Sequence, residues 1–291
     1  MIVLSQVLIR YCIILPAFET ESIITGDFPV HLSLLDFSLL VFSTIIIAAG
    51  GYIINDAFDI DTDAINKPGK NVVGTFISET TAKKLFLGFS FIGICIGFYL
   101  SWKIDKLMMG CVQIFTAVSL WMYATYYKKR FLSGNLLIAL LTSLSLLVVG
   151  LFEPEFYRNF IYLLLYSGFA FSLTLLREII KDIEDVEGDE RTHCKTLPVR
   201  LGIPASKRVV YGIIILNILL ILYTLYQYFY SNLIFNFWIM ASMFTIPLLA
   251  LFGLVRMAEE MKDYYYAGMF TKIIMLAGIL TMIPFYYYFL R

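Results

Sequence analysis

Long stretches of this sequence contain no charged side chain, and they limit the folds that the chain can adopt. The longest stretch, Val209–Val255, has no Asp, Glu, Lys or Arg over 47 residues. A helix that crosses a bilayer needs about 20 consecutive apolar residues. Six other uncharged runs lie at Phe37–Asn55, Leu85–Trp102, Leu107–Tyr127, Phe131–Phe152, Asn159–Leu176 and Ile273–Leu290. The chain is therefore predicted to be a polytopic membrane protein.

Composition supports this prediction and excludes several other classes of protein. Hydrophobic residues make up 60% of the 291 residues and charged residues only 15%, whereas soluble domains average about 25% charged residues. The formal net charge is zero. Cys12, Cys95 and Cys111 lie inside apolar stretches, and the four cysteines show no spacing typical of a disulfide framework or a zinc site. A secreted disulfide scaffold, a nucleic-acid-binding protein and a soluble dinucleotide-binding enzyme are all excluded.

The apolar runs predict an all-α protein in which nine transmembrane helices form one domain over residues 1–291. Helices are expected rather than strands, because each segment in lipid must satisfy its own backbone hydrogen bonds. The first run starts at Met1 without a polar leader, so we expect the natural start to lie upstream. It also contains Arg10, for which the sequence identifies no partner. The predicted spans are 1–18, 36–55, 85–102, 107–127, 132–152, 159–180, 209–229, 233–255 and 271–290.

The basic residues indicate how the chain is oriented in the membrane. Sixteen of the 22 Lys and Arg residues fall in the loops on one side of the predicted spans. Loops rich in Lys and Arg stay in the cytoplasm. We therefore expect a multi-pass protein of the cell membrane with its N-terminus inside and its C-terminus outside.

Acidic residues gather in two clusters on the expected cytoplasmic side. Both clusters have the pattern D-x-x-D-x-x-x-D, lie 126 residues apart, and follow the second and the sixth predicted span. Positions i, i+3 and i+7 share one face of a continuous helix, whereas Asp61 and Glu187 would lie about 140° away from that face. The clustered aspartates are Asp56, Asp59 and Asp63, and Asp182, Asp185 and Asp189.

Three carboxylates on one helix face repel one another, so the pattern indicates a bound cation. Magnesium prefers hard oxygen ligands and is commonly held by a few carboxylates together with substrate phosphates. Basic residues follow each cluster and would neutralise phosphate oxygens. These residues are Lys67 and Lys70 after the first cluster, and Arg191 and Lys195 after the second. The sequence therefore predicts a magnesium site that holds a diphosphate.

These motifs resemble those of the UbiA superfamily of intramembrane prenyltransferases. The first motif begins at Asn55 and is followed by a basic residue and proline at Lys67-Pro68; the second lies ahead of T-L-P-V-x-L-G. The family's Tyr-x-x-x-Lys pattern is matched by Tyr123 and Lys128, with one additional residue between them. The stretch of residues 177–189 is especially similar to the geranylgeranylglyceryl-phosphate geranylgeranyltransferase branch.

The resemblance implies helices arranged around a central cavity, and magnesium-dependent transfer of an isoprenyl group from a geranylgeranyl-like diphosphate to an acceptor in the lipid bilayer. The best single expectation for the acceptor is geranylgeranylglyceryl phosphate, and an aromatic precursor of quinones or haem is the alternative. The six clustered aspartates are implied to be the catalytic metal ligands. The implied substrate-binding residues are Asn55, Lys67, Lys70, Tyr123, Lys128, Lys129, Arg177, Lys181, Arg191 and Lys195.

A divalent-cation transporter is the competing hypothesis outside the enzyme class, because carboxylates can also relay ions. Transporter sites usually lie near the middle of the bilayer, on interrupted helices. The carboxylates of this chain follow the ends of predicted spans, at the membrane surface. Their position favours an enzyme.

Overall fold

The computed structural model describes residues 1–16, 32–66, 72–153, 160–229 and 234–287. Within these ranges the chain is helical, and its only extended pairing is a single bridge between Val73 and Ile77. The α-helices are α1 (Ile2–Ile9), α3 (Leu34–Phe58), α4 (Ile60–Asn66), α5 (Glu79–Lys103), α6 (Cys111–Met122), α7 (Ser133–Phe152), α8 (Phe160–Glu184), α9 (Val186–Arg191), α10 (Leu197–Leu201), α11 (Ile203–Phe229), α12 (Ile234–Met257), α13 (Met261–Leu280) and α14 (Met282–Phe285).

Seven of the described helices are long and apolar enough to cross a membrane, which confirms an all-helical polytopic protein. The 25 residues of α3, for example, span about 37 Å at 1.5 Å per residue, more than the roughly 30 Å of a hydrocarbon core. The two remaining predicted spans, 1–18 and 233–255, fall on the shorter apolar stretches Ile2–Ile14 and Phe244–Met257.

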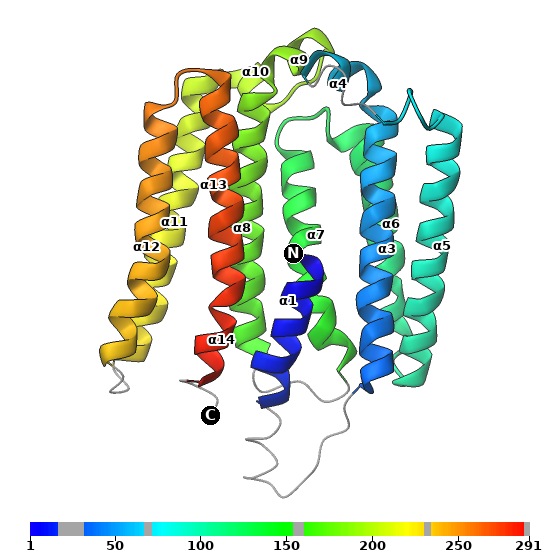
Figure 1. The fold of residues 1–291 in the computed structure, drawn as a ribbon, viewed down its shortest axis with the longest axis vertical. Coiled ribbons are helices and arrows are strands. Elements are labelled where there is room, and N and C mark those ends of the chain that lie inside the picture. Colours follow the sequence, from blue (N-terminus) through cyan, green and yellow to red (C-terminus); the bar gives the residue numbers. More distant parts are fainter. Residues whose placement is uncertain (17–31, 67–71, 154–159, 230–233, 288–291) are drawn as a thin grey trace, which may run out of the picture.

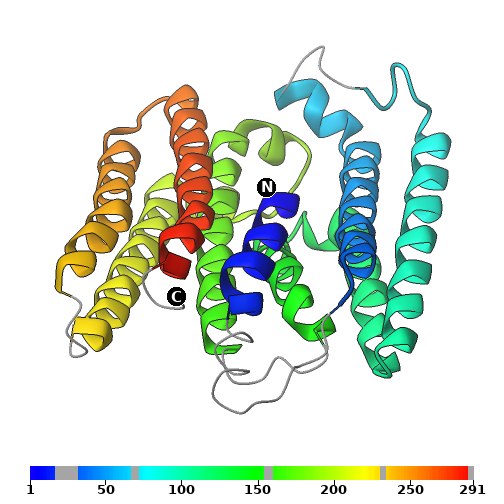
Figure 2. The same cartoon turned by 60° about the horizontal axis from the view of Figure 1, so that its bottom comes forward.

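The long helices form two groups, one of α3, α5, α6 and α7 and the other of α8, α11, α12 and α13 (Figure 1). Helices α7 and α8 join the groups by packing against each other. Helix α1 lies between the two groups in both views (Figure 1 and Figure 2). Close packing in the first group depends on Gly93 of α5. A Cβ atom there would lie 2.4 Å from the Ile47 side chain of α3, so only glycine lets these helices approach.

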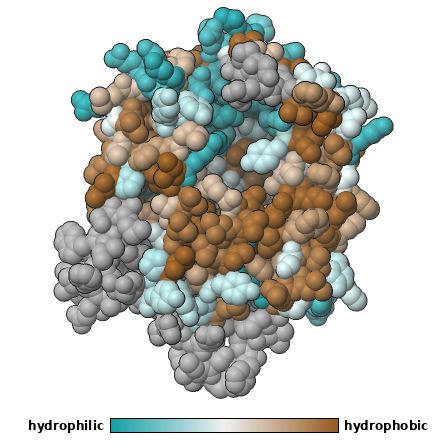
Figure 3. Space-filling view, in the orientation of Figure 1, coloured by the Kyte–Doolittle hydropathy of each residue, from teal (hydrophilic) through white to brown (hydrophobic). Residues whose placement is uncertain are grey.

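The short helices α4, α9 and α10 lie together at one end of the molecule, which we call the polar end (Figure 1). Hydrophilic residues gather at this end, and apolar residues cover most of the middle of the face shown in Figure 3. Helix α5 begins at the polar end, where Ser78 accepts a hydrogen bond from the amide of Thr81. This distribution matches a bundle whose long helices face lipid and whose short helices face water.

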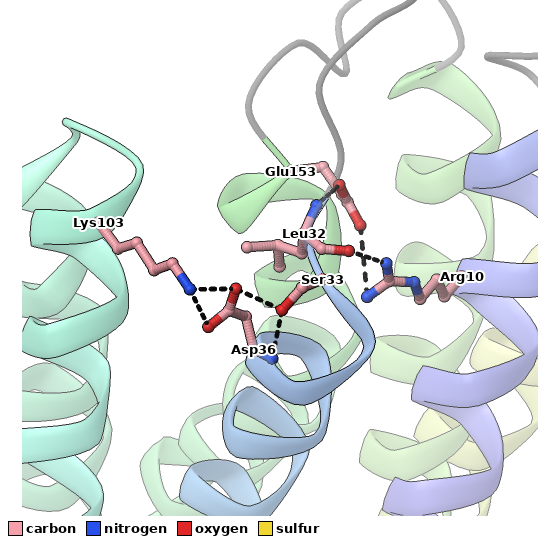
Figure 4. Close-up of polar contacts among 6 residues, drawn as sticks. All are labelled: Arg10, Leu32, Ser33, Asp36, Lys103 and Glu153. Carbon is pink, nitrogen blue, oxygen red and sulfur yellow. Dashed lines mark hydrogen bonds and ion pairs between the residues drawn. The ribbon is translucent and has the colours of Figure 1, made fainter.

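Arg10 has a partner at the opposite end of the bundle. Its guanidinium group is buried, lies 3.8 Å from the carboxylate of Glu153 and donates a hydrogen bond to the carbonyl oxygen of Leu32 (Figure 4). The Leu32 amide donates in turn to Glu153 at 3.1 Å, and the Phe37 ring lies 4.4 Å below the guanidinium carbon. The network fastens the N-terminal helix to the ends of α3 and α7.

We predict that Glu153→Gln destabilises the protein by about 3–5 kcal/mol, because it leaves the Arg10 charge buried without its counter-charge. Glu79→Gln is the matched control, since the pair of Glu79 with Lys83 is exposed and is expected to contribute at most about 1 kcal/mol. Thermal or denaturant unfolding in detergent measures both effects. Equal stability losses in the two variants would contradict a stabilising role for the buried pair.

Candidate active site

Both aspartate motifs lie at the polar end, and the structure corrects the assumption that each sits on one continuous helix. Helix α3 ends at Phe58 and α8 ends at Glu184, so each chain segment bends at the middle aspartate of its motif. Asp59 has φ −100° and ψ 3°, and Asp185 has φ −90° and ψ 6°. The short helices α4 and α9 follow directly.

The bends improve the electrostatic surroundings of the carboxylates that follow them. Carboxylates are unfavourable at the negative C-terminal end of a helix and favourable at the positive N-terminal end. By bending, the chain places Asp61 and Asp63 in the first turn of α4, and Glu187 and Asp189 in the first turn of α9. The two motifs therefore share one local structure, although the prediction that three aspartates of each motif occupy a single helix face is wrong.

One lysine connects the two clusters. The ammonium group of Lys128 is paired with the buried carboxylate of Asp59 in the first motif. The same ammonium group acts electrostatically on Asp189 in the second motif. Tyr123 lies one helical turn below Lys128 and interacts electrostatically with both Asp59 and Asp182. The structure thus brings the end of α3, the helical turn that follows α6, the end of α8 and α9 to one site.

Tyr123 and Lys128 are aligned by a π-helical turn over Tyr123–Tyr127. The amide of Lys128 donates to the carbonyl oxygen of Tyr123 at 3.0 Å, five residues back rather than four. A π turn accommodates one extra residue without ending the helix. The π turn accommodates the additional residue between Tyr123 and Lys128, so Lys128 still lies one turn above Tyr123.

Asn135 is a site residue that the sequence analysis missed. It is buried in the first turn of α7, and its side-chain amide donates a hydrogen bond of 2.8 Å to the carboxylate of Asp182. Asn55 makes the equivalent contact in the first cluster by donating to Asp59. The available signal was a polar residue near the start of an apolar run, at the same end of the bundle as the two clusters.

Negative charge is concentrated in the second cluster. Burial and the neighbouring charge of Asp185 together raise the pKa of Asp189 to about 6, against the opposing effects of a hydrogen bond with Thr196 and of the charges of Lys128 and Lys181. Glu178, also missed by the sequence analysis, is buried on α8 and is paired with Arg177. An additional cation at this site would lower the electrostatic cost of its carboxylates.

The oxygen donors present fit magnesium only if the substrate completes its coordination. Within the described ranges, no three His, Cys, Asp or Glu side chains converge closely enough to form a metal site on their own. However, Oδ1 of Asn55 is buried beside Asp59 without a hydrogen-bond partner among the described atoms. Hard oxygen donors of this kind, completed by phosphate oxygens, are what magnesium requires.

The other predicted substrate-binding residues lie in different surroundings. Lys181 is surrounded by the charges of Glu178, Asp185 and Asp182. Arg191 is exposed and paired with Glu187 on the outer side of α9. Lys129 and Lys195 are exposed. Lys67 and Lys70 lie outside the described ranges.

Comparison with known proteins identifies a family and close relatives. The profile of the UbiA prenyltransferase family matches residues 25–289. The chain is 36% identical over 240 residues to a digeranylgeranylglyceryl phosphate synthase of Saccharolobus solfataricus, covering 82% of this chain and 80% of the relative. It is 30% identical over 275 residues to the synthase of the same name from Methanobrevibacter smithii, covering 91% and 90%.

Solved structures share the fold. A UbiA homologue from Aeropyrum pernix K1 superposes with a TM-score of 0.69 at 14% identity, covering 97% of this chain and 98% of the other. A UbiA homologue from Archaeoglobus fulgidus, bound to DMAPP and Mg²⁺, superposes with a TM-score of 0.61 at 16% identity, with the same coverage. At these identities the likeness establishes a common fold.

We predict that the two acidic positions Asp59 and Asp61 differ sharply in metal binding. Asp59 is buried at the shared site and Asp61 is exposed. Asp59→Asn should weaken Mn²⁺ binding in the presence of inorganic diphosphate by more than the roughly 10–100-fold that partners of metal ligands typically cost, and Asp61→Asn should leave it nearly unchanged. Electron paramagnetic resonance titration of folded protein measures both affinities. Equal losses would disprove this arrangement of the first cluster.

Asn135→Leu should weaken Mn²⁺ binding by roughly 10–100-fold, because Asp182 loses the hydrogen bond that orients its carboxylate. Asn217→Leu is the matched control, since Asn217 is also a buried asparagine but bonds to Ser172 and Ile213 within the second helix group. The same titration, with thermal unfolding as a check on folding, compares the two. A loss of metal affinity in both variants would indicate a general structural defect instead.

Proposed function

This chain belongs to the UbiA prenyltransferase family, and on that basis we propose that it transfers a geranylgeranyl group to geranylgeranylglyceryl phosphate. The two synthases described above are named for the product of this reaction. One structural observation supports the chemistry: Lys128 is paired with Asp59 and acts on Asp189, so both acidic clusters surround one cationic group.

The reaction exchanges one carbon–oxygen bond for another. The free hydroxyl oxygen of the acceptor bonds to the allylic carbon C1 of geranylgeranyl diphosphate, while the bond from C1 to the diphosphate oxygen breaks. Diphosphate leaves with that electron pair, and the hydroxyl proton is released. The products are digeranylgeranylglyceryl phosphate, diphosphate and one proton. The protein must therefore neutralise a highly charged leaving group.

We assign metal binding to the two acidic clusters, Asp56, Asp59, Asp63, Asp182, Asp185 and Asp189. Magnesium, when bound, spreads the charge of the diphosphate and makes it a better leaving group. Lys128 adds a preorganised positive charge inside the site, because Asp59 already holds its ammonium group there. Asn55 and Asn135 orient one carboxylate in each cluster.

The membrane-spanning helices keep water away from the reacting carbon. An allylic cation reacts with any nearby nucleophile, so a site that excludes water favours the acceptor hydroxyl over hydrolysis. We propose that the nine predicted helices enclose a cavity for the isoprenyl chains below the polar end. We also place the polar end in the cytoplasm, because its loops carry most of the basic residues.

We predict that purified protein converts geranylgeranyl diphosphate and geranylgeranylglyceryl phosphate to digeranylgeranylglyceryl phosphate only when magnesium is present. Excess chelator should abolish turnover and added Mg²⁺ should restore it, since without a metal the clustered carboxylates repel the diphosphate. Mass spectrometry of the lipid product and a diphosphate-release assay follow the reaction.

A panel of acceptors tests the acceptor assignment in the same assay. Full turnover in excess chelator would contradict the metal role. Prenylation of an aromatic acceptor such as 4-hydroxybenzoate, with no product from geranylgeranylglyceryl phosphate, would replace the proposed acceptor by the aromatic class. Divalent-cation flux in vesicles without diphosphate release would indicate a transporter.

A further inference from the structure

Four basic residues lie on two adjoining chain segments beside the acidic site. We call them the basic cluster: Lys129, Arg130, Lys195 and Arg200. Two chain segments supply them, and two contacts hold these segments side by side. The amide of Lys195 donates to the carbonyl oxygen of Lys129 at 2.9 Å, and the Arg200 guanidinium carbon lies 5.5 Å from the centre of the Phe131 ring.

The basic cluster has no carboxylate partner among the described residues, whereas three other cations at the polar end are ion-paired. Lys83, Lys128 and Arg191 are each in an ion pair with an Asp or a Glu. In contrast, Arg130 stacks on the Tyr126 ring at 3.8 Å, and Arg200 contacts an aromatic ring as well. Stacking on a ring orients a guanidinium group and leaves its N–H donors available to an anion.

The basic cluster is continuous with the acidic site. Lys129 directly follows Lys128, which is paired with Asp59. The amide of Cys194 donates to the carbonyl oxygen of Asp189 at 2.8 Å, and the Cys194 side chain interacts electrostatically with both Asp189 and Lys129. The basic cluster therefore begins one residue from Lys128, which lies in the site proposed to hold the diphosphate.

We propose that the basic cluster binds the phosphate group of the lipid acceptor, a phosphomonoester. This inference rests on the proposed function and deepens it. A phosphomonoester carries a charge of about −1.5 to −2 at pH 7, and only glycerol carbons separate it from the reacting hydroxyl. The acceptor phosphate must therefore lie beside the diphosphate, and an additional set of cations is needed to offset the repulsion between these two anions.

The geometry also separates the roles of three lysines near the acidic motifs. Lys128 points to Asp59, within the acidic site, so it serves the donor diphosphate. Lys129 and Lys195 lie on adjoining segments beyond it, are exposed and have no acidic partner among the described residues, so they serve the acceptor. Lys195, predicted from the sequence to neutralise the diphosphate, is reassigned by this proposal.

The test uses the double variant Lys129→Gln/Lys195→Gln in nanodiscs of neutral phosphatidylcholine. We expect the KM for geranylgeranylglyceryl phosphate to rise at least about tenfold, while the KM for geranylgeranyl diphosphate changes less than about twofold. With geranylgeranylglycerol, which lacks the phosphate, variant and wild type should have the same KM. The control Lys83→Gln/Lys262→Gln removes the same charge from exposed lysines that form ion pairs, and it should match the wild type.

Two results would overturn the proposal. One is an unchanged KM for geranylgeranylglyceryl phosphate in the folded double variant. The other is a defect that appears only in nanodiscs containing anionic phosphatidylglycerol, which would mean that the cluster contacts bilayer headgroups instead of the substrate.

A direct binding measurement keeps this inference distinct from the proposed function. Without any prenyl donor, the wild type should bind geranylgeranylglyceryl phosphate at least about tenfold more tightly than geranylgeranylglycerol, and the double variant should lose this preference. If the wild type shows the preference but forms no product, the proposed function fails and the binding site stands. If it forms product without the preference, the proposed function stands and this inference fails.

Discussion

The repulsion among carboxylates at the polar end is the constraint on which the rest of the site depends. Aspartates from two motifs, 126 residues apart in the sequence, lie where apolar helices meet water. Three features of the structure offset their repulsion: Lys128 pairs with Asp59, the side chains of Asn55 and Asn135 each donate to a carboxylate, and both chain segments bend at the middle aspartate. Each feature lowers the energy of negative charge in surroundings that solvate it poorly. The same features prepare the site for a cation and a diphosphate.

The helix bundle provides rigid support for this site. Its two groups of helices carry one acidic motif each, at the end of α3 and at the end of α8. The π-helical turn that follows α6 in the first group brings Tyr123 and Lys128 between the motifs. At the opposite end the buried pair of Arg10 and Glu153 holds α1 against α3 and α7. The acidic motifs and this buried pair thus lie at opposite ends of the bundle, away from its middle, where a charge would be most costly.

Sequence patterns predicted much of this arrangement because they reflect local constraints. Uncharged runs report which segments can lie in lipid, and seven of the nine predicted spans coincide with helices long and apolar enough to cross the membrane. The family resemblance inferred from the two motifs is confirmed by the profile that matches residues 25–289. The assumption of straight helices through the motifs was wrong, because spacing counted along an ideal helix does not show where a helix ends, and both helices end just before the middle aspartate.

By itself, the sequence determined that the chain is a helical membrane protein with two similar acidic motifs on one side, since hydropathy and motif spacing are properties of consecutive residues. The tertiary structure alone decided which side chains meet. Asn135 donates to Asp182, Glu153 pairs with Arg10, and Lys195 lies beside Lys129. In each case the two residues are tens of residues or more apart in the sequence. Such contacts depend on how the helices pack and on which carboxylate each cation can reach. A pattern of neighbouring residues in the sequence predicts neither of these.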